Sequence, residues 1–378
     1  MLNMNMAMTR LLILVTCTQN GVVYIHHDVD LLPILLNLAV ERHFECLCYI
    51  HTTTNPNNSQ ISEQRTPTCM HDWLSRDEIQ LLLNLPAKIA IIQHFLLLLQ
   101  RYLSVFMQMV DYGLKDRVAL ITGANNPQGI GATTAFAFAR EGAKVVLIYK
   151  RIPRPFDITK TDKNGADRYF QANAGNADVV ESKLQEMGAD YLIIESDISN
   201  EDAVRDIYSE VLERYGRIDI LVNNAADCDM DGLDTIEKIK QHVIDETFAV
   251  NVRGSILMMR EFINLRGNYG RIINLSTDAA QVFAGQITYG ASKATLEALT
   301  RSIALEVAKY GITVNAVAPG PTQTGWIDED FEKEVIPINP MGKLIQPQDI
   351  ADTILFLASA QAKMLTGQVI KVSGGHAL

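Results

Sequence analysis

From residue 117 onward, short runs of apolar residues alternate with longer stretches in which apolar positions recur every three or four residues. The short runs have the length and the β-branched content of buried strands, and the longer stretches have the period of amphipathic helices. The expected strands span residues 117–122, 144–149, 191–195, 218–222, 271–275, 312–317 and 368–372. Strands that alternate with helices assemble into parallel sheets through right-handed crossovers. The pattern therefore predicts an α/β fold, a doubly wound seven-stranded parallel sheet with helices on both faces.

Two helix boundaries follow from residues that favour helix ends. The first helix is expected over residues 130–141, because Gly142 follows it and glycine favours the position just after a helix. A later helix is expected to begin after Ser199, whose hydroxyl could cap it, with Glu201 and Asp202 in the first turn.

One connection departs from this alternation. Residues 151–177 form a segment that is too long and too rich in Pro, Gly, Asn and Asp for an ordinary link between a strand and a helix. Such a segment is either a functional loop or a tolerated surface insertion, because closing a long loop costs little free energy. Both interpretations stay open at this point.

The composition of the chain changes sharply near residue 108. The first 108 residues contain one of the 23 glycines, Gly21, but four of the five cysteines. A single fold rarely changes composition so abruptly. We therefore expect an N-terminal extension over residues 1–108, poorly ordered or helical and outside the fold, followed by one globular domain over residues 109–378.

The extension carries only weak signals of its own. Residues 1–15 have the outline of a signal peptide, but no small-residue cleavage site follows them. Residues 81–99 are apolar but interrupted by charge and proline, which favours an amphipathic helix over a membrane span. Met107 and Met109 lie just before the first strand, so a start of translation at this point is a further hypothesis. The histidines and cysteines lack the paired spacing of a metal site, and no metal is expected; they include His43, Cys46, Cys48, Cys69 and His71.

Charge and cysteine content exclude some classes of function. The net charge of -11 offers no basic surface for nucleic acid or for an anionic membrane, so neither partner is expected. Only Cys228 lies in the predicted domain, which indicates no disulfide framework and suits a reducing cytoplasm.

A glycine-rich turn lies between the first expected strand and the first expected helix. Gly123, Gly129 and Gly131 would let backbone amides and the helix N-terminus approach a pyrophosphate closely. This arrangement is typical of a Rossmann-type dinucleotide site.

The end of the second strand bears on the choice of dinucleotide. NAD-binding turns usually carry an acid here for the ribose hydroxyls, but this chain has Tyr149, Lys150 and Arg151. Two cations suit a 2′-phosphate, so NADP(H) is predicted in preference to NAD(H).

Tyr289 and Lys293 lie four residues apart on an expected helix and therefore share a face. The ammonium of Lys293 could favour ionisation of the phenol, which predicts a lowered pKa for Tyr289. A phenol of this kind can act as a proton donor near neutral pH.

Together, these features resemble the short-chain dehydrogenase/reductase family over residues 113–378. The ordered markers are the glycine turn at 122–131, Asp197, Asn223-Asn-Ala-Ala226, Asn251, Ser276, Tyr289, Lys293, Pro319-Gly320 and Thr324. The set is similar in particular to that of 3-oxoacyl-[acyl-carrier-protein] reductases. Residues 109–378 would then be an NAD(P)-binding domain of this family.

The resemblance implies a catalytic set for the exchange of hydride between a nicotinamide and a carbonyl carbon. Tyr289 would donate the proton to the substrate oxygen, and Lys293 would lower its pKa and hold the nicotinamide ribose. Ser276 would bind the substrate carbonyl, with Thr277 as a rival because the preceding strand is one residue short. Of the two, Ser276 has the sequence distance from Tyr289 that is usual in the family. Asn251 would anchor a water in a proton relay through Lys293.

The resemblance also implies residues that contact the cofactor. Asp197 and Ile198 would border the adenine, Asn223 would support the sheet beside the cofactor, and Thr324 would reach the nicotinamide end. The full predicted set is Gly123, Asn125, Gly129, Ile130, Gly131, Tyr149, Lys150, Arg151, Asp197, Ile198, Asn224, Ala225, Tyr289, Lys293, Pro319, Gly320 and Thr324. The turn has five residues between Gly123 and Gly129, where the commonest form has three, which puts the phosphate contacts of Asn125, Asn126 and Gln128 in doubt.

The predicted function is that of an NADP(H)-dependent oxidoreductase that interconverts a small-molecule carbonyl and a secondary alcohol. A dehydrogenase of a sugar, steroid or small alcohol and a non-catalytic dinucleotide-binding scaffold remain alternatives. An enoyl reductase is disfavoured, because it would place a lysine at position 296, which is Leu296. Residues 325–343 are expected to cover the substrate. The family also implies a homo-tetramer or homo-dimer formed through the helices that carry Asn251 and Tyr289.

Overall fold

The computed structural model describes residues 16–17, 23–24, 111–228 and 234–376. The chain divides into two units, Met1–Met109 and Val110–Leu378, which are considered separately. In the first unit, β1 (Thr16–Cys17) and β2 (Val23–Tyr24) pair in antiparallel fashion. The other predictions for the extension, including the helix over 81–99 and the scattered histidines and cysteines, lie outside the described residues.

The second unit is built on a seven-stranded sheet in the order β5-β4-β3-β6-β7-β8-β9, with every neighbouring pair parallel. The strands are β3 (Val118–Thr122), β4 (Lys144–Tyr149), β5 (Tyr191–Glu195), β6 (Ile220–Asn223), β7 (Gly270–Leu275), β8 (Ile312–Pro319) and β9 (Val369–Val372). The chain order reverses between β3 and β6, so the carboxyl ends of these two strands form the edge where a doubly wound fold binds its ligand. The predicted doubly wound α/β fold is confirmed.

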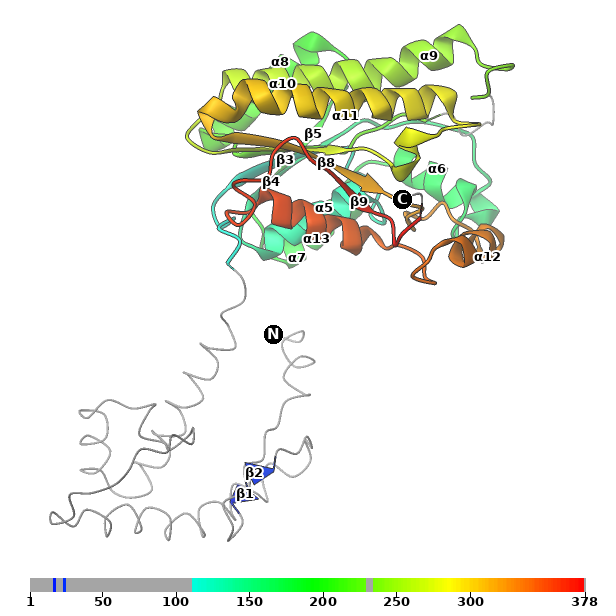
Figure 1. Cartoon of the computed structure of the whole chain (residues 1–378), viewed down its shortest axis with the longest axis horizontal. Helices are drawn as coiled ribbons and strands as arrows, with labels where there is room; N and C mark the ends of the chain where they lie inside the picture. Colours follow the sequence, from blue (N-terminus) through cyan, green and yellow to red (C-terminus); the bar gives the residue numbers. More distant parts are fainter. Residues whose placement is uncertain (1–15, 18–22, 25–110, 229–233, 377–378) are drawn as a thin grey trace, which may run out of the picture. The chain divides into compact units, whose positions relative to one another are not determined.

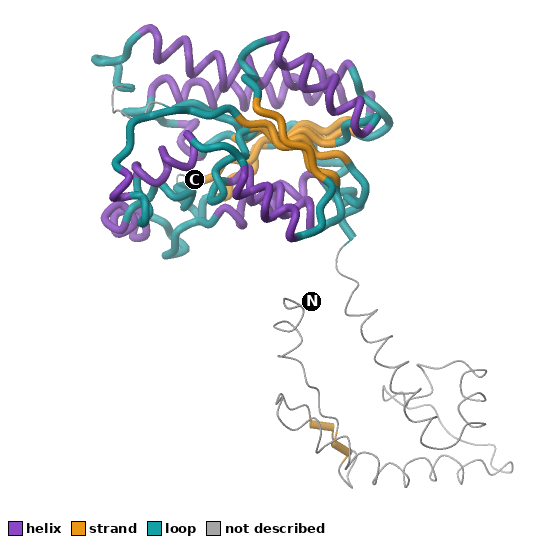
Figure 2. Tube along the Cα trace, turned by 180° about the vertical axis from the view of Figure 1, so that it is seen from behind, coloured by secondary structure: helices purple, strands orange, loops and turns teal. Residues whose placement is uncertain are grey.

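Helices cover both faces of the sheet (Figures 1 and 2). One layer contains α8 (Glu201–Tyr215), α9 (Gln241–Phe248), α10 (Ser255–Asn264) and α11 (Ile287–Val307). The opposite layer contains α5 (Ile130–Arg140), α7 (Asp178–Glu186) and α13 (Pro347–Ala358). Successive side chains of a strand point to opposite faces, and β3 follows this rule, since Leu120 packs in one apolar core and Ile121 in the other. Both cores are fully buried, which explains why the strands read as nearly continuous apolar runs.

Most of the shorter elements lie around the carboxyl edge of the sheet. They are the 3-10 turns η2 (Ile158–Lys160) and η4 (Asp278–Gln281), the π-helical turn η3 (Ala249–Gly254), and the helices α6 (Ala166–Ala174) and α12 (Glu329–Ile338). The 3-10 turn η5 (Ala308–Tyr310) comes directly before β8 and so lies at the opposite edge. The irregular segment predicted at 151–177 therefore contains a helix, α6, which begins after Gly165 and ends before Gly175. Within the described residues, no helix is long and apolar enough to cross a membrane, and no group of acids, histidines and cysteines is arranged to hold a metal ion.

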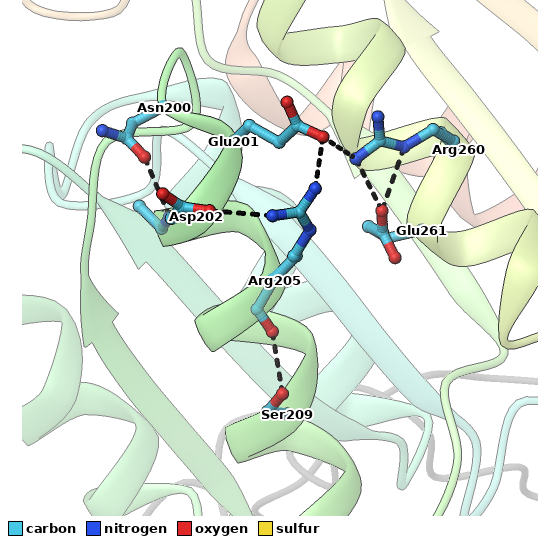
Figure 3. A network of polar contacts seen from close by, with 8 residues as sticks. Asn200, Glu201, Asp202, Arg205, Ser209, Arg260 and Glu261 are labelled. Atoms are coloured by element: carbon cyan, nitrogen blue, oxygen red, sulfur yellow. Dashed lines mark hydrogen bonds and ion pairs between the residues drawn. The ribbon is translucent and has the colours of Figure 1, made fainter.

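The start of α8 differs from the prediction. Asn200, not Ser199, is the N-cap, because its side chain accepts a hydrogen bond from the backbone amide of Ala203 at 3.0 Å. The Ser199 hydroxyl instead donates to Asp197 at 2.7 Å. Farther along, Figure 3 shows Glu201 accepting from both Arg205 and Arg260, which ties α8 to α10 on the exposed surface. Exposed ion pairs of this kind add little stability, so the two helices are held mainly by their apolar faces.

Candidate active site

The glycine turn joins β3 to α5 at the carboxyl edge of the sheet. Gly123 has a φ angle of +71°, and a Cβ atom there would lie 2.7 Å from the Cα of Ala225. A Cβ on Gly131 would lie 2.5 Å from the carbonyl oxygen of Gly123. Both positions therefore require glycine, because any side chain would push the turn away from the neighbouring strand end.

The N-terminus of α5 fits the pyrophosphate of a dinucleotide. Gly129 is its N-cap and provides no side-chain cap, so the first amides of the helix, beginning with that of Ile130, have no capping acceptor. Amides and the helix dipole together favour an anion at this place. Gly123, Gly129, Ile130 and Gly131 would hold the phosphates of a bound NAD(P)(H).

Asn224 and Ala225 shape the glycine turn from the end of β6. The Asn224 side-chain amide donates to the carbonyl oxygens of Thr122 at 2.9 Å and Gly123 at 2.8 Å. The backbone amides of Asn224 and Ala225 donate to the Thr122 hydroxyl at 3.1 and 3.0 Å. Next to them, Asn223 donates to Asn274 at 2.9 Å and so links the middle strands of the sheet.

The polar residues of the long glycine turn bind protein groups. Asn125 donates to the carbonyl oxygens of Asn173 at 3.3 Å and Gly175 at 3.0 Å, at the end of α6. Asn126 donates to the carbonyl of Thr324 at 3.1 Å. The Gln128 side-chain oxygen accepts from Arg168 of α6 at 2.6 Å. The additional residues of the turn therefore bind the 151–177 segment and the segment after β8. The side chain of Asn125 binds these protein carbonyls in place of the predicted phosphate.

The end of β4 carries the two predicted cations, and each is paired with an acid at the end of β5. Lys150 lies 2.7 Å from Asp197, and Arg151 lies 2.7 Å from Glu195. Both cationic side chains remain 56% exposed. Tyr149 is buried beside them, and its hydroxyl reaches Glu195 at 3.5 Å.

The remaining predicted cofactor residues lie along the same edge. Ile198 is buried, and a Cβ on Gly254 would lie 3.0 Å from its side chain. Pro319 ends β8, and the amide of Gly320 donates to Val372 at 3.1 Å. The backbone of Thr324 is held by Asn126 of the glycine turn. The structure therefore gathers the ends of β3, β4, β5, β6 and β8 around one edge, as the order of the motifs predicts.

Tyr289 and Lys293 lie in the first two turns of α11. The Lys293 nitrogen is 5.7 Å from the centre of the Tyr289 ring and donates to the carbonyl oxygen of Leu275 at 2.6 Å. Desolvation lowers the pKa of the buried Lys293 ammonium to about 8. Desolvation also raises the pKa of Tyr289, with smaller contributions from Cys228, Tyr169 and Asp278. The lowered pKa predicted for Tyr289 is thus wrong for this structure, because burial outweighs an ammonium that is directed toward Leu275.

Asn251 lies in the π-helical turn η3, between α9 and α10. Its side-chain amide donates to the carbonyl of Asp227 at 2.8 Å and to the hydroxyl of Ser292 at 3.0 Å. Its side-chain oxygen accepts from the amide of Asp227 at 2.7 Å. A π turn widens the helix locally and often occurs at functional sites. Here Asn251 joins three elements, the loop after β6, η3 and the start of α11.

The two rival hydroxyls after β7 differ in their partners. Ser276 donates its hydroxyl hydrogen to Glu297 at 2.7 Å. The Thr277 oxygen accepts from the amide of Ala279 at 3.3 Å, an interaction that leaves its own hydrogen available. Thr277 therefore has the donor that a substrate carbonyl needs, whereas the hydrogen of Ser276 is directed to a carboxylate.

Two acids beside α11 are not signalled by the sequence. Asp234 accepts from the amides of Thr288 at 2.7 Å and Tyr289 at 3.1 Å, so it caps α11 from a distant loop. Asp278 is buried and lies 2.6 Å from His376 near the C-terminus. No local spacing signals the first contact, because the partners are 54 residues apart.

The expected substrate cover after β8 has a small core of its own. Ile327, Val335 and Leu344 are buried together, and the rings of Trp326 and Phe331 lie 5.2 Å apart. The segment also meets the 151–177 segment, since the amide of Gly165 donates to Gly325 at 2.8 Å.

Comparisons with known proteins agree with this geometry. A family profile described as Enoyl-(Acyl carrier protein) reductase matches residues 158–377. The chain is 35% identical over 274 residues to the (2S)-[(R)-hydroxy(phenyl)methyl]succinyl-CoA dehydrogenase subunit BbsD of Thauera aromatica, covering 70% of this chain and 98% of that protein. It is 33% identical over 263 residues to the 3-oxoacyl-[acyl-carrier-protein] reductase FabG of Staphylococcus aureus, covering 68% of this chain and 96% of that protein.

A solved structure gives the same assignment. The short-chain dehydrogenase/reductase from Serratia marcescens superposes with a TM-score of 0.59 at 28% identity, covering 70% of this chain and 99% of that one. The chain belongs to the short-chain dehydrogenase/reductase family, whose members bind NAD(P)(H). It is an oxidoreductase that acts on carbonyl and alcohol groups.

Proposed function

We propose that the protein is an NADP(H)-dependent reductase of 3-oxoacyl thioesters. The observation that carries the proposal is the pair Tyr289 and Lys293, which α11 presents at the carboxyl end of β7. Both the Thauera and the Staphylococcus relatives are named for acyl thioester substrates. A dehydrogenase of a sugar, steroid or small alcohol would use the same site with another substrate.

A bound nicotinamide supplies or accepts the hydride at the substrate carbon. Tyr289 gives a proton to the substrate oxygen during reduction, and the nearby ammonium of Lys293 stabilises the resulting phenolate. Thr277 or Ser276 donates a hydrogen bond to that oxygen. Asn251 holds the loop after β6 against the start of α11 and so keeps the proton-transfer groups in position.

The preference for NADP(H) rests on Lys150 and Arg151. Both are more than half exposed at the end of β4, and their partners Asp197 and Glu195 are carboxylates that a 2′-phosphate could replace. The expected result is tighter binding of NADPH than of NADH, with a selective loss of NADPH affinity in Lys150→Ala and Arg151→Ala. Equal dissociation constants for the two cofactors would contradict this preference.

A family profile named for an enoyl reductase raises a second reaction, reduction of a carbon–carbon double bond. The spacing of Tyr289 and Lys293 and the leucine at position 296 favour carbonyl reduction. Oxidation of NADPH should therefore be followed with acetoacetyl and crotonyl thioesters in parallel. Turnover of the acetoacetyl thioester alone, abolished in Tyr289→Phe, supports the proposal, whereas turnover of the crotonyl thioester alone would replace it.

We also propose assembly as a homo-tetramer or homo-dimer through η3, α10 and α11, and a cytoplasmic location. Ile256 on α10 and Leu305 on α11 are exposed apolar side chains on these helices, at 38% and 83%. Light scattering that shows only monomer would exclude such assembly.

A further inference from the structure

A cavity of about 400 Å³ lies between the 151–177 segment, the loop after β6 and the helix α9. Arg154, Phe170, Asp227, His242, Val243 and Glu246 contribute to its walls. Its volume is in the range of small-molecule sites, roughly 300 to 1,000 Å³. Two of these walls come from the segment whose composition departs from the rest of the domain.

Two residues that line the cavity are linked to the predicted catalytic residues. Asp227 forms one wall, and its backbone makes two hydrogen bonds to the side chain of Asn251, at 2.7 and 2.8 Å. Phe170 forms another wall and follows Tyr169, whose ring centre is 6.3 Å away. Tyr169 in turn lies near enough to Tyr289 for a charge on it to raise the pKa of that phenol. His242 and Glu246 are exposed, so the cavity opens to solvent beside α9.

The charges on the walls favour a neutral ligand. Arg154 is balanced by Asp227, 3.7 Å away, and also donates to the carbonyl oxygen of Cys228 at 3.3 Å. A small anion would meet the carboxylates of Asp227 and Glu246, and a small cation would meet Arg154. An uncharged chain with amide donors and acceptors can satisfy both kinds of group. Phe170 and Val243 offer apolar surface for the methylene groups between the amides.

We propose that this cavity binds the amide-bearing arm of a pantetheine thioester, and that Phe170 and Glu246 determine the preference for substrates that carry this arm. The proposal rests on the proposed reductase function, and it adds the part of the substrate that lies beyond the reacting carbonyl. Pantetheine is common to coenzyme A and to acyl carrier proteins. The arm would leave the catalytic centre past Asp227 and reach solvent between His242 and Glu246.

The test compares three thioesters that share one reacting group and carry arms of increasing length. The S-ethyl, N-acetylcysteamine and pantetheine thioesters of acetoacetate share the carbonyl and differ only in the length of the arm. The expected kcat/KM rises at least about tenfold from the S-ethyl to the pantetheine thioester, equivalent to about 1.4 kcal/mol of added binding. Phe170→Ala and Glu246→Ala should each remove most of that gain. Ile158→Ala, at a residue of the same segment that is 64% exposed, serves as the control and should keep the gain.

Each outcome bears on a different claim. If the S-ethyl thioester is reduced but kcat/KM does not rise with the length of the arm, the arm site is overturned and the reductase function is kept. A gain that persists in folded Phe170→Ala and Glu246→Ala, as judged by thermal unfolding, places the arm elsewhere and overturns the assignment of this cavity. No turnover of any acetoacetyl thioester with either cofactor overturns the reductase function and the arm site together. If the gain is found, the coenzyme A and carrier-protein thioesters distinguish the two sources of the arm.

Discussion

The hydroxyl of Ser276 donates to the carboxylate of Glu297, at 2.7 Å, across the junction between β7 and α11. This bond uses the hydrogen that a substrate carbonyl would need, and Thr277 keeps its own. We expect Thr277→Val to lower kcat/KM about 100-fold, the usual cost of a lost donor to a developing oxyanion. Ser276→Ala should lower kcat/KM by less than tenfold. Steady-state kinetics of Thr277→Val and Ser276→Ala measure both changes in kcat/KM. If Ser276→Ala instead lowers kcat/KM more than Thr277→Val does, Ser276 is the residue that binds the substrate carbonyl, as its sequence distance from Tyr289 predicts.

Burial of Lys293 makes the stability of the fold depend on pH. Its pKa is lowered by desolvation from 10.5 to about 8, so below pH 8 the folded protein pays for a buried charge. Between about pH 8 and 10.5 the unfolded chain still holds the proton that the folded protein has released, and stability rises with pH. Lys293→Met removes this term and should stabilise the protein by about 1 to 3 kcal/mol at pH 7.

Urea unfolding of wild type and Lys293→Met at several pH values checks this expectation. The difference in unfolding free energy between the two proteins should shrink steadily from pH 8 to pH 10.5. A difference that stays constant over this range would show that the ammonium is not desolvated. Comparing the two proteins cancels the titration of all other groups.

Asp234 fixes the start of the helix that carries Tyr289. Its carboxylate accepts from the amides of Thr288 and Tyr289, and from the Thr288 hydroxyl at 2.6 Å. Asp234→Ala leaves these buried donors without an acceptor and should destabilise the protein by about 1 to 3 kcal/mol. It should also lower kcat, because the position of the phenol is no longer fixed. Denaturation and kinetics on Asp234→Ala and Asp234→Asn together test this, since the amide can still accept. An unchanged kcat in Asp234→Ala would contradict the positioning role.

The bond between Arg168 and Gln128 connects the 151–177 segment to the glycine turn. Because Arg168 donates to Gln128 at 2.6 Å, we expect Arg168→Met to loosen the turn and weaken NADPH binding about three- to tenfold. Fluorescence titration with NADPH gives the dissociation constant. Lys160→Met is a matched control, since Lys160 pairs only locally with Asp157. Equal affinities for wild type and Arg168→Met would mean that the segment does not support the cofactor site.

The fold was predictable because its signals are local. Each strand is an apolar run, and Gly142 follows the first helix at the expected place. The helix boundary at Ser199 was one residue wrong, because Ser199 and Asn200 are both good caps and only the three-dimensional contact with Asp197 separates them.

The sequence predicted which residues lie close together but not the hydrogen bonds that they make. The order of motifs placed Asn251, Tyr289 and Lys293 together, since parallel strands deliver their carboxyl ends to one edge. The direction of the Ser276 hydroxyl and the cap from Asp234 depend on partners that are distant in sequence. The pKa of Tyr289 was misjudged for a related reason, because spacing reveals a neighbouring charge but not the degree of burial.

The hydrogen bonds from Asn125 to the end of α6 connect two segments of unusual length, the glycine turn and the connection after β4. The glycine turn is longer than the commonest form, and the connection after β4 is longer than an ordinary one. If the turn alone were shortened, the carbonyls of Asn173 and Gly175 would lose the Asn125 amide, and Asn173 would keep only the amide of Ile152. If residues 166–175 alone were deleted, the side-chain amide of Asn125 would lose these acceptors. In a chimera with a relative of ordinary lengths, the two segments would therefore have to be exchanged as a pair.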